Sequence, residues 1–131
     1  MPHLQIDINR NLSDATKKNI ANRFKALFSS VMGTGTDHIA TSIRELGTYS
    51  LDIGRVKDHE LGVALVNADI REGRELKKRR ALALGFIEIL NDLVNIPVKN
   101  IYITFSEHKG EDFHLHELHL RTWKKGDDPL T

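Results

Sequence analysis

Apolar and polar residues alternate along residues 2–9, where polar side chains separate Leu4, Ile6 and Ile8. An alternation with a period of two predicts a β-strand that buries one face. Further apolar segments predict strands near 38–45, over 63–70 and over 101–105. The run at 63–70 is nearly continuous, which is typical of a strand covered on both faces. The polar, glycine-containing connection of residues 46–61 has the length and composition for a short hairpin.

Apolar residues at helical spacing predict two helices. The first follows Ser13, a favourable N-cap residue, and ends before Gly33 and Gly35. Its predicted inward positions are Ile20, Phe24, Leu27, Phe28 and Val31. The second helix covers about 74–94 and is stopped by Pro97. Its predicted inward positions are Leu76, Ala83, Phe86, Ile87, Leu90 and Leu93.

The two halves of the chain repeat each other without a gap, at an offset of 62 residues, the separation of Ile8 from Ile70. The same offset aligns Phe24 with Phe86, Val31 with Leu93, Ile39 with Ile101 and Ile43 with Phe105. A strand, a helix and a second strand that all keep one register are difficult to obtain by chance. The sequence therefore predicts one domain, residues 1–131, built from two β-α-β units over about 2–60 and 61–131.

Two such units related by a local twofold axis predict an α+β fold, a four-stranded mixed sheet with both helices on one face. The first strand is then antiparallel to the third, and Pro2 lies opposite Ile70 and Arg71. The equivalent corner places Ala64 beside the end of the first strand. Ala64 lies within the chain, whereas only Met1 precedes Pro2. The two corners therefore differ in the presence of a chain terminus.

The bulk composition excludes several classes of function. Lys and Arg number 19 and Asp and Glu number 18, and a net charge of +1 argues against a nucleic-acid-binding or membrane-surface protein. The absence of cysteine excludes disulfides, thiolate catalysis and cysteine–zinc sites. No apolar run has the length of a membrane span, and the first residues lack the pattern of a secretory signal. We therefore expect a soluble, cytoplasmic protein.

Pro2 has two interpretations. As a small second residue it permits removal of the initiator methionine, and the new terminus would carry a secondary amine. Such an amine titrates near neutrality and can act as a general base or acid. The alternative is a stiff start to an edge strand, where the missing N–H of proline costs nothing.

The segment IREGRE, residues 70–75, joins the third predicted strand to the second predicted helix. Arg71 and Arg74 place positive charge at a helix N-terminus, where the helix dipole is already positive. Two guanidiniums beside free helix N–H groups suit a carboxylate or phosphate; alternatively, each arginine pairs with a neighbouring acidic residue on the surface. An amine beside such a clamp suits proton transfer at the carbon next to a carboxylate-bearing enol or carbonyl.

Pro2 at the start of a β-α-β strand, the duplicated unit and the Arg71/Arg74 pair in REGR resemble the tautomerase superfamily. This superfamily includes 4-oxalocrotonate tautomerase, macrophage migration inhibitory factor and cis-3-chloroacrylic acid dehalogenase. The resemblance covers roughly residues 2–107, and REGR with the later NIYITFSE is most similar to the dehalogenase branch. It implies a catalytic terminal proline, arginines that bind the carboxylate of a small substrate, no cofactor and assembly as a homotrimer.

The chain departs from the dehalogenase pattern at three positions. It has Ser29 in place of a histidine, Thr104 in place of a tyrosine and Leu115 near the position of a water-activating glutamate. These departures count against dehalogenation and hydration. Enol–keto tautomerisation needs only the proline and the arginines. The resemblance therefore predicts a tautomerase or isomerase acting on a small 2-hydroxy-2-enoate or 2-oxo acid, with Pro2 as general base.

The segment FHLHELHL, residues 113–120, contains three histidines. In a strand His114 and His116 share one face and His119 points away, whereas in a helix His116 and His119 come together. Neither arrangement forms a good three-histidine site, so we expect no metal. The segment either packs as a polar face on the core or a neighbouring subunit, or lines the pocket of Pro2. The candidates for lining that pocket are His114, His116, Glu117 and Thr104.

Two other functions are compatible with the sequence. A protonated Pro2 would serve as the acid in a hydratase, dehalogenase or decarboxylase of small unsaturated acids. Retention of Met1 would instead acylate the proline nitrogen and remove its basic lone pair. In that case the protein would be a non-catalytic interaction protein with a vestigial pocket.

Overall fold

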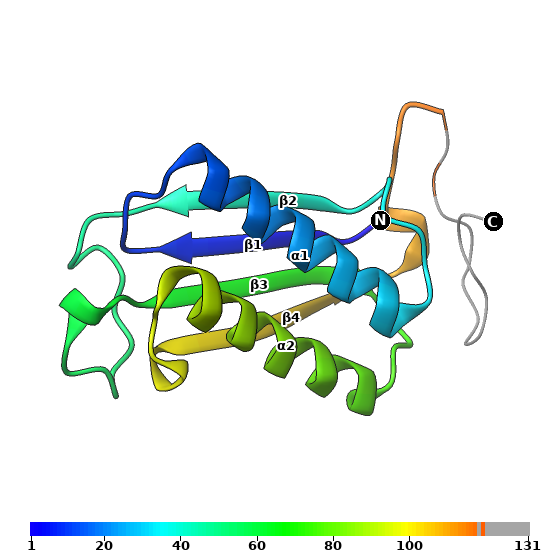
Figure 1. Cartoon of the computed structure of the whole chain (residues 1–131). Helices are drawn as coiled ribbons and strands as arrows, with labels where there is room; N and C mark the ends of the chain where they lie inside the picture. Colours follow the sequence, from blue (N-terminus) through cyan, green and yellow to red (C-terminus); the bar gives the residue numbers. More distant parts are fainter. Residues whose placement is uncertain (118, 120–131) are drawn as a thin grey trace.

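The computed structural model describes residues 1–117 and residue 119, and this part of the chain forms an α+β fold. The elements are β1 (His3–Ile8), α1 (Asp14–Met32), β2 (Ala40–Glu45), β3 (Ala64–Arg71), α2 (Leu76–Val94) and β4 (Ile101–His108), with short 3₁₀ helices η1 (His59–Leu61), η2 (Val98–Asn100) and η3 (Gly110–Asp112). Both α-helices cover one face of the sheet (Figure 1). None of the helices described is long and apolar enough to cross a membrane.

The sheet has the strand order β2-β1-β3-β4. β1 is parallel to β2 and β3 is parallel to β4, whereas β1 and β3 are antiparallel. Each parallel pair is joined through one helix, which gives the two β-α-β units that the repeat predicts. The predicted fold class is therefore confirmed.

The core lies between the helices and the inner face of the sheet. Phe24 of α1 and Phe86 of α2 stack with their ring centroids 4.3 Å apart. These two residues are equivalent in the repeat, so the helices meet near the local twofold axis. The inner face of the central strands supplies Leu4, Ile6, Ile8, Ala64, Val66, Ala68 and Ile70, all of them buried.

Local signals set the helix ends. Ser13 caps α1, and its side chain accepts a hydrogen bond from the Thr16 N–H. The helix ends at Gly33, whose φ of 69° is in the left-handed region that glycine adopts readily. α2 begins at Leu76, later than predicted, and Leu76 is 69% exposed. The inward assignment of Leu76 is wrong because it precedes buried Leu82 by six residues, about 240° around the helix.

Two predictions about the middle of the chain are wrong. Residues 46–61, all described, contain η1 and no strand, so they form no hairpin. Their apolar side chains Leu51 and Val56 instead pack with Val63 in a small second core. From Ala64 to Ile70 the buried residues of β3 alternate with partly exposed ones, because the helices cover one face of the sheet and leave the other open. The near-continuous apolar run therefore does not mark a strand covered on both faces of the protomer.

Candidate active site

The start of β1 lies beside the end of β3. The antiparallel register pairs His3 with Asp69, and one further step along the strands places Pro2 opposite Ile70. Pro2 is buried, and its carbonyl accepts a hydrogen bond from the Ala40 N–H at 3.0 Å. The contact with β2 and the neighbouring β3 therefore hold the chain terminus in a defined place. The predicted position of Pro2 relative to the end of the third strand agrees with this register.

Arg71 and Arg74 lie at the end of β3 and in the turn that follows it, next to the start of β1. Arg71 is the last residue of β3 and is only 4% exposed, with both terminal guanidinium nitrogens buried. Arg74 follows in the turn before α2, and its Nη1 donates to the carbonyl of Met32 at 3.4 Å. Gly73 adopts a φ of 95° between the two arginines, a conformation that glycine allows at low cost. The turn thus brings two cations into one place ahead of α2.

The charges of the two arginines act on the chain terminus. The pKa of the Met1 amine is lowered from its ordinary value of 8.0 to about 5, first by burial and then by the positive charges of Arg71 and Arg74. An amine with this pKa is neutral at pH 7 and keeps its lone pair. The corner can therefore provide a neutral base beside two cations. We call Met1, Pro2, Arg71 and Arg74 the amine corner.

An Asp–His pair on the open face of the sheet adjoins the amine corner. The Oδ1 atom of Asp69 lies 3.1 Å from Nε2 of His108, and Oδ2 accepts from Gln5 at 2.6 Å. The parallel register places His108 directly beside Arg71. His108 is not among the predicted site residues, because the predicted last strand ends at Phe105 whereas β4 continues for three more residues. Continuing the strand to His108 would have revealed the pairing.

Comparison with known proteins identifies the fold. No family model and no curated protein matches the chain. A macrophage migration inhibitory factor-like protein from Entamoeba histolytica has a solved structure with a TM-score of 0.72 and 23% identity, over 87% of this chain and 94% of that one. A fused 4-OT, described as a wild-type asymmetric trimer, gives 0.77 and 13% over 89% and 94%. A malonate semialdehyde decarboxylase inhibited by 3-bromopropiolate gives 0.72 and 14% over 85% and 86%.

The chain has the tautomerase-superfamily fold. These identities are all low, so the similarity concerns the arrangement of the backbone. Similarity to the cis-3-chloroacrylic acid dehalogenase branch stays a prediction, because the neighbours do not select one branch of the superfamily.

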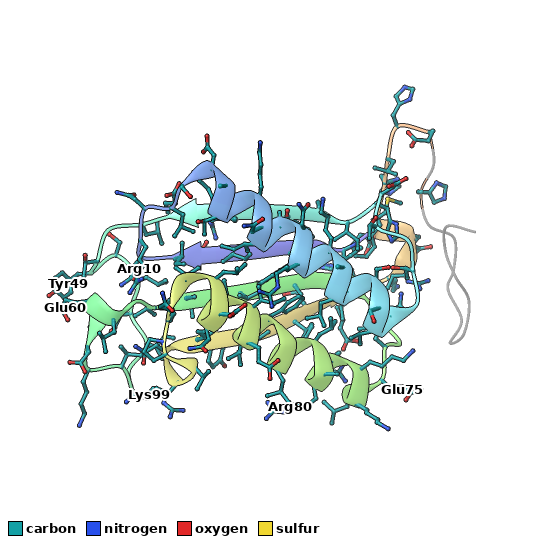
Figure 2. The ribbon with its side chains drawn as sticks, in the orientation of Figure 1. Arg10, Tyr49, Glu60, Glu75, Arg80 and Lys99 are labelled. Atoms are coloured by element: carbon teal, nitrogen blue, oxygen red, sulfur yellow. The ribbon has the colours of Figure 1, made fainter. Side chains whose placement is uncertain are left out.

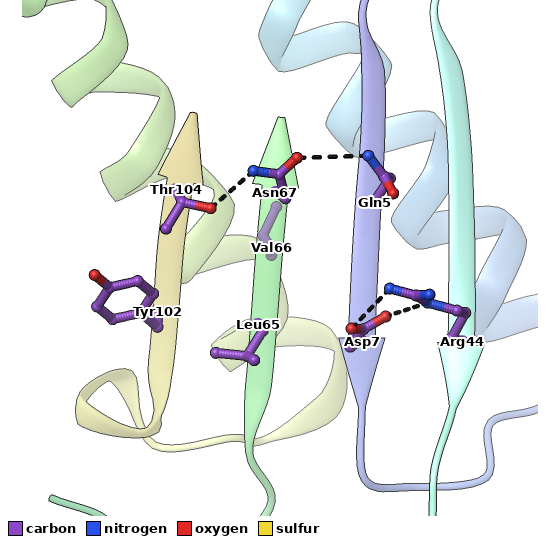
Figure 3. A pocket seen from close by; sticks show the side chains of 8 residues that line it. All are labelled: Gln5, Asp7, Arg44, Leu65, Val66, Asn67, Tyr102 and Thr104. Atoms are coloured by element: carbon purple, nitrogen blue, oxygen red, sulfur yellow. Dashed lines mark hydrogen bonds and ion pairs between the residues drawn. The ribbon is translucent and has the colours of Figure 1, made fainter. Parts of the chain in front are cut away.

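Within this tautomerase fold, Thr104 lies on the open face of the sheet and away from Pro2. It borders a pocket of about 270 Å³ (Figure 3), and its hydroxyl accepts a hydrogen bond from Asn67 at 2.8 Å. An ion pair between Asp7 and Arg44 forms part of the same wall. The lining contains none of the four residues of the amine corner. The assignment of Thr104 to the pocket of Pro2 stays a prediction.

The histidine-containing segment adopts neither predicted form. His114 and His119 face each other across an isolated antiparallel bridge, with their ring centroids 5.3 Å apart. His114, His116 and Glu117 are exposed, and the segment leads away from the sheet and helices (Figure 1). The described residues 114–117 therefore do not pack on the core of the protomer. Residues 118 and 120 of this segment lie outside the described part of the chain.

No group of three or more metal-binding side chains occurs among the described residues. Asp69 and His108, which adjoin the amine corner, are instead bonded to other protein groups. Asp69 contacts His108 and Gln5, and the ring of Phe113 meets the ring of His108 edge-on at 5.7 Å. The chemistry that this corner offers is proton transfer and anion binding.

Proposed function

We propose that the protein is a cofactor-independent tautomerase or isomerase acting on a small 2-hydroxy-2-enoate or 2-oxo acid. The observation that carries the proposal is the lowered pKa of the terminal amine beside Arg71 and Arg74. The fold supports it, since structures with this fold include a fused 4-OT and a malonate semialdehyde decarboxylase. We place this activity in the cytoplasm, in line with the composition of the chain.

Pro2 acts as the general base once Met1 has been removed. The terminal amine then belongs to a residue that is buried, whereas Met1 is partly exposed. Burial disfavours the charged form of an amine, and so do the two neighbouring cations. The same two causes therefore favour the neutral form of a terminal Pro2 nitrogen, which is the form that accepts a proton. Retained Met1 would convert this nitrogen into an amide without basicity, so processing is a condition of activity.

Arg71 and Arg74 bind the carboxylate of the substrate. Guanidinium groups form paired, charge-assisted hydrogen bonds with carboxylates, and this fixes both position and orientation. The same charges stabilise the negative charge that develops on the enolate. Because Arg71 is buried, its field is less screened by water than that of a surface arginine. In the simplest mechanism Pro2 takes the proton from the enol oxygen and returns it to carbon.

We further propose that the protein assembles as a homotrimer. The fused 4-OT neighbours are described as asymmetric trimers, and they share this fold over 89% of the chain. The exposed segment that contains His114 and His116 is a part that a neighbouring subunit would cover. In that assembly His116 and Glu117 would have a partner surface that the protomer lacks.

Decarboxylation or hydration is the second candidate function. The malonate semialdehyde decarboxylase neighbour favours it, and Pro2 would then act in its protonated form. The position of Ser29 counts against hydration, because its hydroxyl donates a hydrogen bond to the Thr34 carbonyl at the end of α1. A non-catalytic interaction protein would follow from retained Met1.

Two measurements test the proposal. Intact-mass analysis should show the loss of Met1. The processed protein should ketonise a simple enolpyruvate, and Pro2→Ala should lower kcat/KM by about 100-fold or more, the usual contribution of a positioned general base. A form that retains Met1 is the matched control and should be equally inactive. If Pro2→Ala ketonises the substrate as fast as wild type, Pro2 is not the base.

A further inference from the structure

The repeat places two aspartates at equivalent positions on the open face of the sheet, and their partners differ. Asp7 binds the guanidinium of Arg44 through two contacts of 2.6 and 3.0 Å. Asp69, 62 residues later, binds the imidazole of His108. Arginine keeps its charge throughout the physiological pH range, whereas histidine gains and loses a proton within it. The aspartate next to the amine corner is therefore paired with a side chain that can exchange a proton.

His108 lies within reach of a substrate held by Arg71. The two residues are direct neighbours in the parallel register of β3 and β4. The Glu72 N–H donates to the His108 carbonyl at 2.8 Å, which fixes the backbone of β4 to the turn that carries the arginines. Neighbouring strands are about 4.8 Å apart, so His108 and the start of β1 are separated by about 10 Å across β3. A small carboxylic acid substrate, together with the side chains of Pro2 and His108, can span that distance.

The imidazole of His108 is held in a fixed orientation. Asp69 bonds to Nε2 through one oxygen and is itself anchored by Gln5 through the other. The ring of Phe113 stands edge-on to the imidazole with an interplanar angle of 83°. The side chain is nevertheless 42% exposed, so a substrate can contact it. The charged groups beside it are Asp69, whose Oδ1 lies 3.1 Å from Nε2, and Arg71, its direct neighbour in the register of β3 and β4.

We propose that His108, oriented by Asp69, is a second catalytic residue that delivers the proton to carbon. This inference rests on the proposed function of Pro2 as the base, and it assigns to His108 the delivery of the proton to carbon that the simplest mechanism gives to Pro2. Neutral Pro2 takes the proton of the enol O–H group, and the electron pair of that bond forms the carbonyl. The electron pair of the C=C bond forms a new C–H bond with the proton of the His108 imidazolium. The step leaves protonated Pro2 and neutral His108, and both return to their starting states by proton exchange with water.

The test is the rate and stereochemistry of ketonisation of phenylenolpyruvate in D₂O. Deuterium delivered to C3 creates a stereocentre whose configuration reports the direction of delivery. Wild type should give one configuration. His108→Gln should lower kcat about 100-fold with KM changed less than about threefold, and its residual product should be racemic. Unchanged kcat and unchanged configuration in His108→Gln would overturn the proposal.

Two further variants separate catalysis from a structural effect. Asp69→Asn keeps the imidazole and removes its carboxylate partner, so kcat should fall about tenfold while one configuration still predominates. Asp7→Asn is the matched control at the equivalent position, and it should leave both kcat and configuration unchanged. If His108→Gln does not fold, Asp69→Asn decides, because an unchanged kcat in that variant contradicts the proposal. Pro2→Ala with wild-type activity would instead overturn the proposed function itself.

Discussion

The two ends of the β1–β3 pair are equivalent in the repeat but differ in their chemistry. The offset of 62 residues places Asn9 where the other end has Arg71, and Val63 where it has Met1. Asn9 Oδ1 accepts a hydrogen bond from the Val63 N–H at 2.7 Å. At the amine corner, burial and then the charge of Arg71 instead oppose protonation of the Met1 amine. Equivalent backbone positions thus support a neutral hydrogen bond at one end and charge repulsion at the other.

The polar side chains of the Asn9 end are engaged with the backbone. The amide nitrogen of Asn9 donates to the carbonyls of Thr48 and His59, each at 3.0 Å. Arg10 donates to the carbonyls of Val94 and Leu61 at 2.9 and 2.7 Å. In Figure 2 Arg10 lies with Tyr49 at one end of the molecule, opposite the end that holds Glu75. We call this end, with Asn9, Arg10 and Val63, the amide corner.

The comparison shows how a duplicated unit can come to have one reactive site. At the amide corner an arginine and an asparagine hold loop carbonyls, which stabilises the connection between the two units. At the amine corner two arginines direct their charge to a chain terminus, which costs stability and favours a neutral amine. We therefore expect substitutions at the amide corner to change stability, and substitutions at the amine corner to change activity.

Exchanging arginine for alanine at each corner should give the largest contrast. Arg71→Ala should lower kcat/KM for an enolpyruvate by about 100- to 1,000-fold, since it removes a charge that stabilises the enolate. Arg10→Ala should instead lower the free energy of unfolding by about 2 kcal/mol, because two backbone carbonyls lose their charged donor. Steady-state kinetics and urea denaturation of the folded variants measure both effects.

Arg44→Ala is the control for this contrast. Arg44 is an exposed arginine on the same sheet, and its pair with Asp7 lies at the surface, where such pairs contribute little. Neither activity nor stability should change by much. Equal effects of Arg71→Ala and Arg10→Ala on kcat/KM would show that the two corners are not functionally distinct.

Removing the hydrogen bonds of Asn9 should have the next largest effect. Asn9→Ala deletes three bonds and leaves the buried Val63 N–H without its acceptor, so unfolding should become easier by about 3 kcal/mol. Gly62→Ala tests the same packing independently. Gly62 has a φ of 100°, and an added Cβ would lie 2.7 Å from Ile96. Both variants should unfold at lower urea concentration while the folded fraction keeps its kcat; a loss of kcat without a loss of stability would contradict this assignment.

The repeat made much of the amine corner predictable. Once Ile8 and Ile70 are equivalent, a twofold arrangement of two β-α-β units requires the start of the first strand to lie beside the end of the third. The register of His3 with Asp69 agrees with that requirement. The twofold arrangement follows from the spacing of apolar residues alone. Both halves keep this spacing because they fill the core in the same way.

The Asp69–His108 pair and the exposed face of the sheet were not predictable in the same way. The last three residues of β4 are polar, so the pattern of burial gives no sign that the strand continues to His108. Cross-strand pairs on an open face depend on that register and on side-chain hydrogen bonds. The prediction that Leu76 lies in the core fails for a related reason, because a single apolar residue in a first turn has no neighbours that fix its face. Which side chains pair on the open face therefore depends on the strand register, and that register is known only from the backbone structure.

The smallest expected effect on stability comes from the terminal amine. It tests the difference between the two corners without a change of side chain. In the form that retains Met1, the pKa of the folded-state amine is about 5, whereas the ordinary value is 8.0. Between these pH values the unfolded chain binds more protons than the folded chain, so the free energy of unfolding should rise as the pH increases from 5 to 8. Because the amine is partly exposed and screened by solvent, we expect a rise of only about 1–2 kcal/mol. Acetylation of the terminus removes the amine but leaves every histidine, so the difference between the two urea-denaturation profiles isolates its contribution. Arg71→Gln should reduce that difference, and identical profiles before and after acetylation would show that the amine corner places no charge conflict on the terminus.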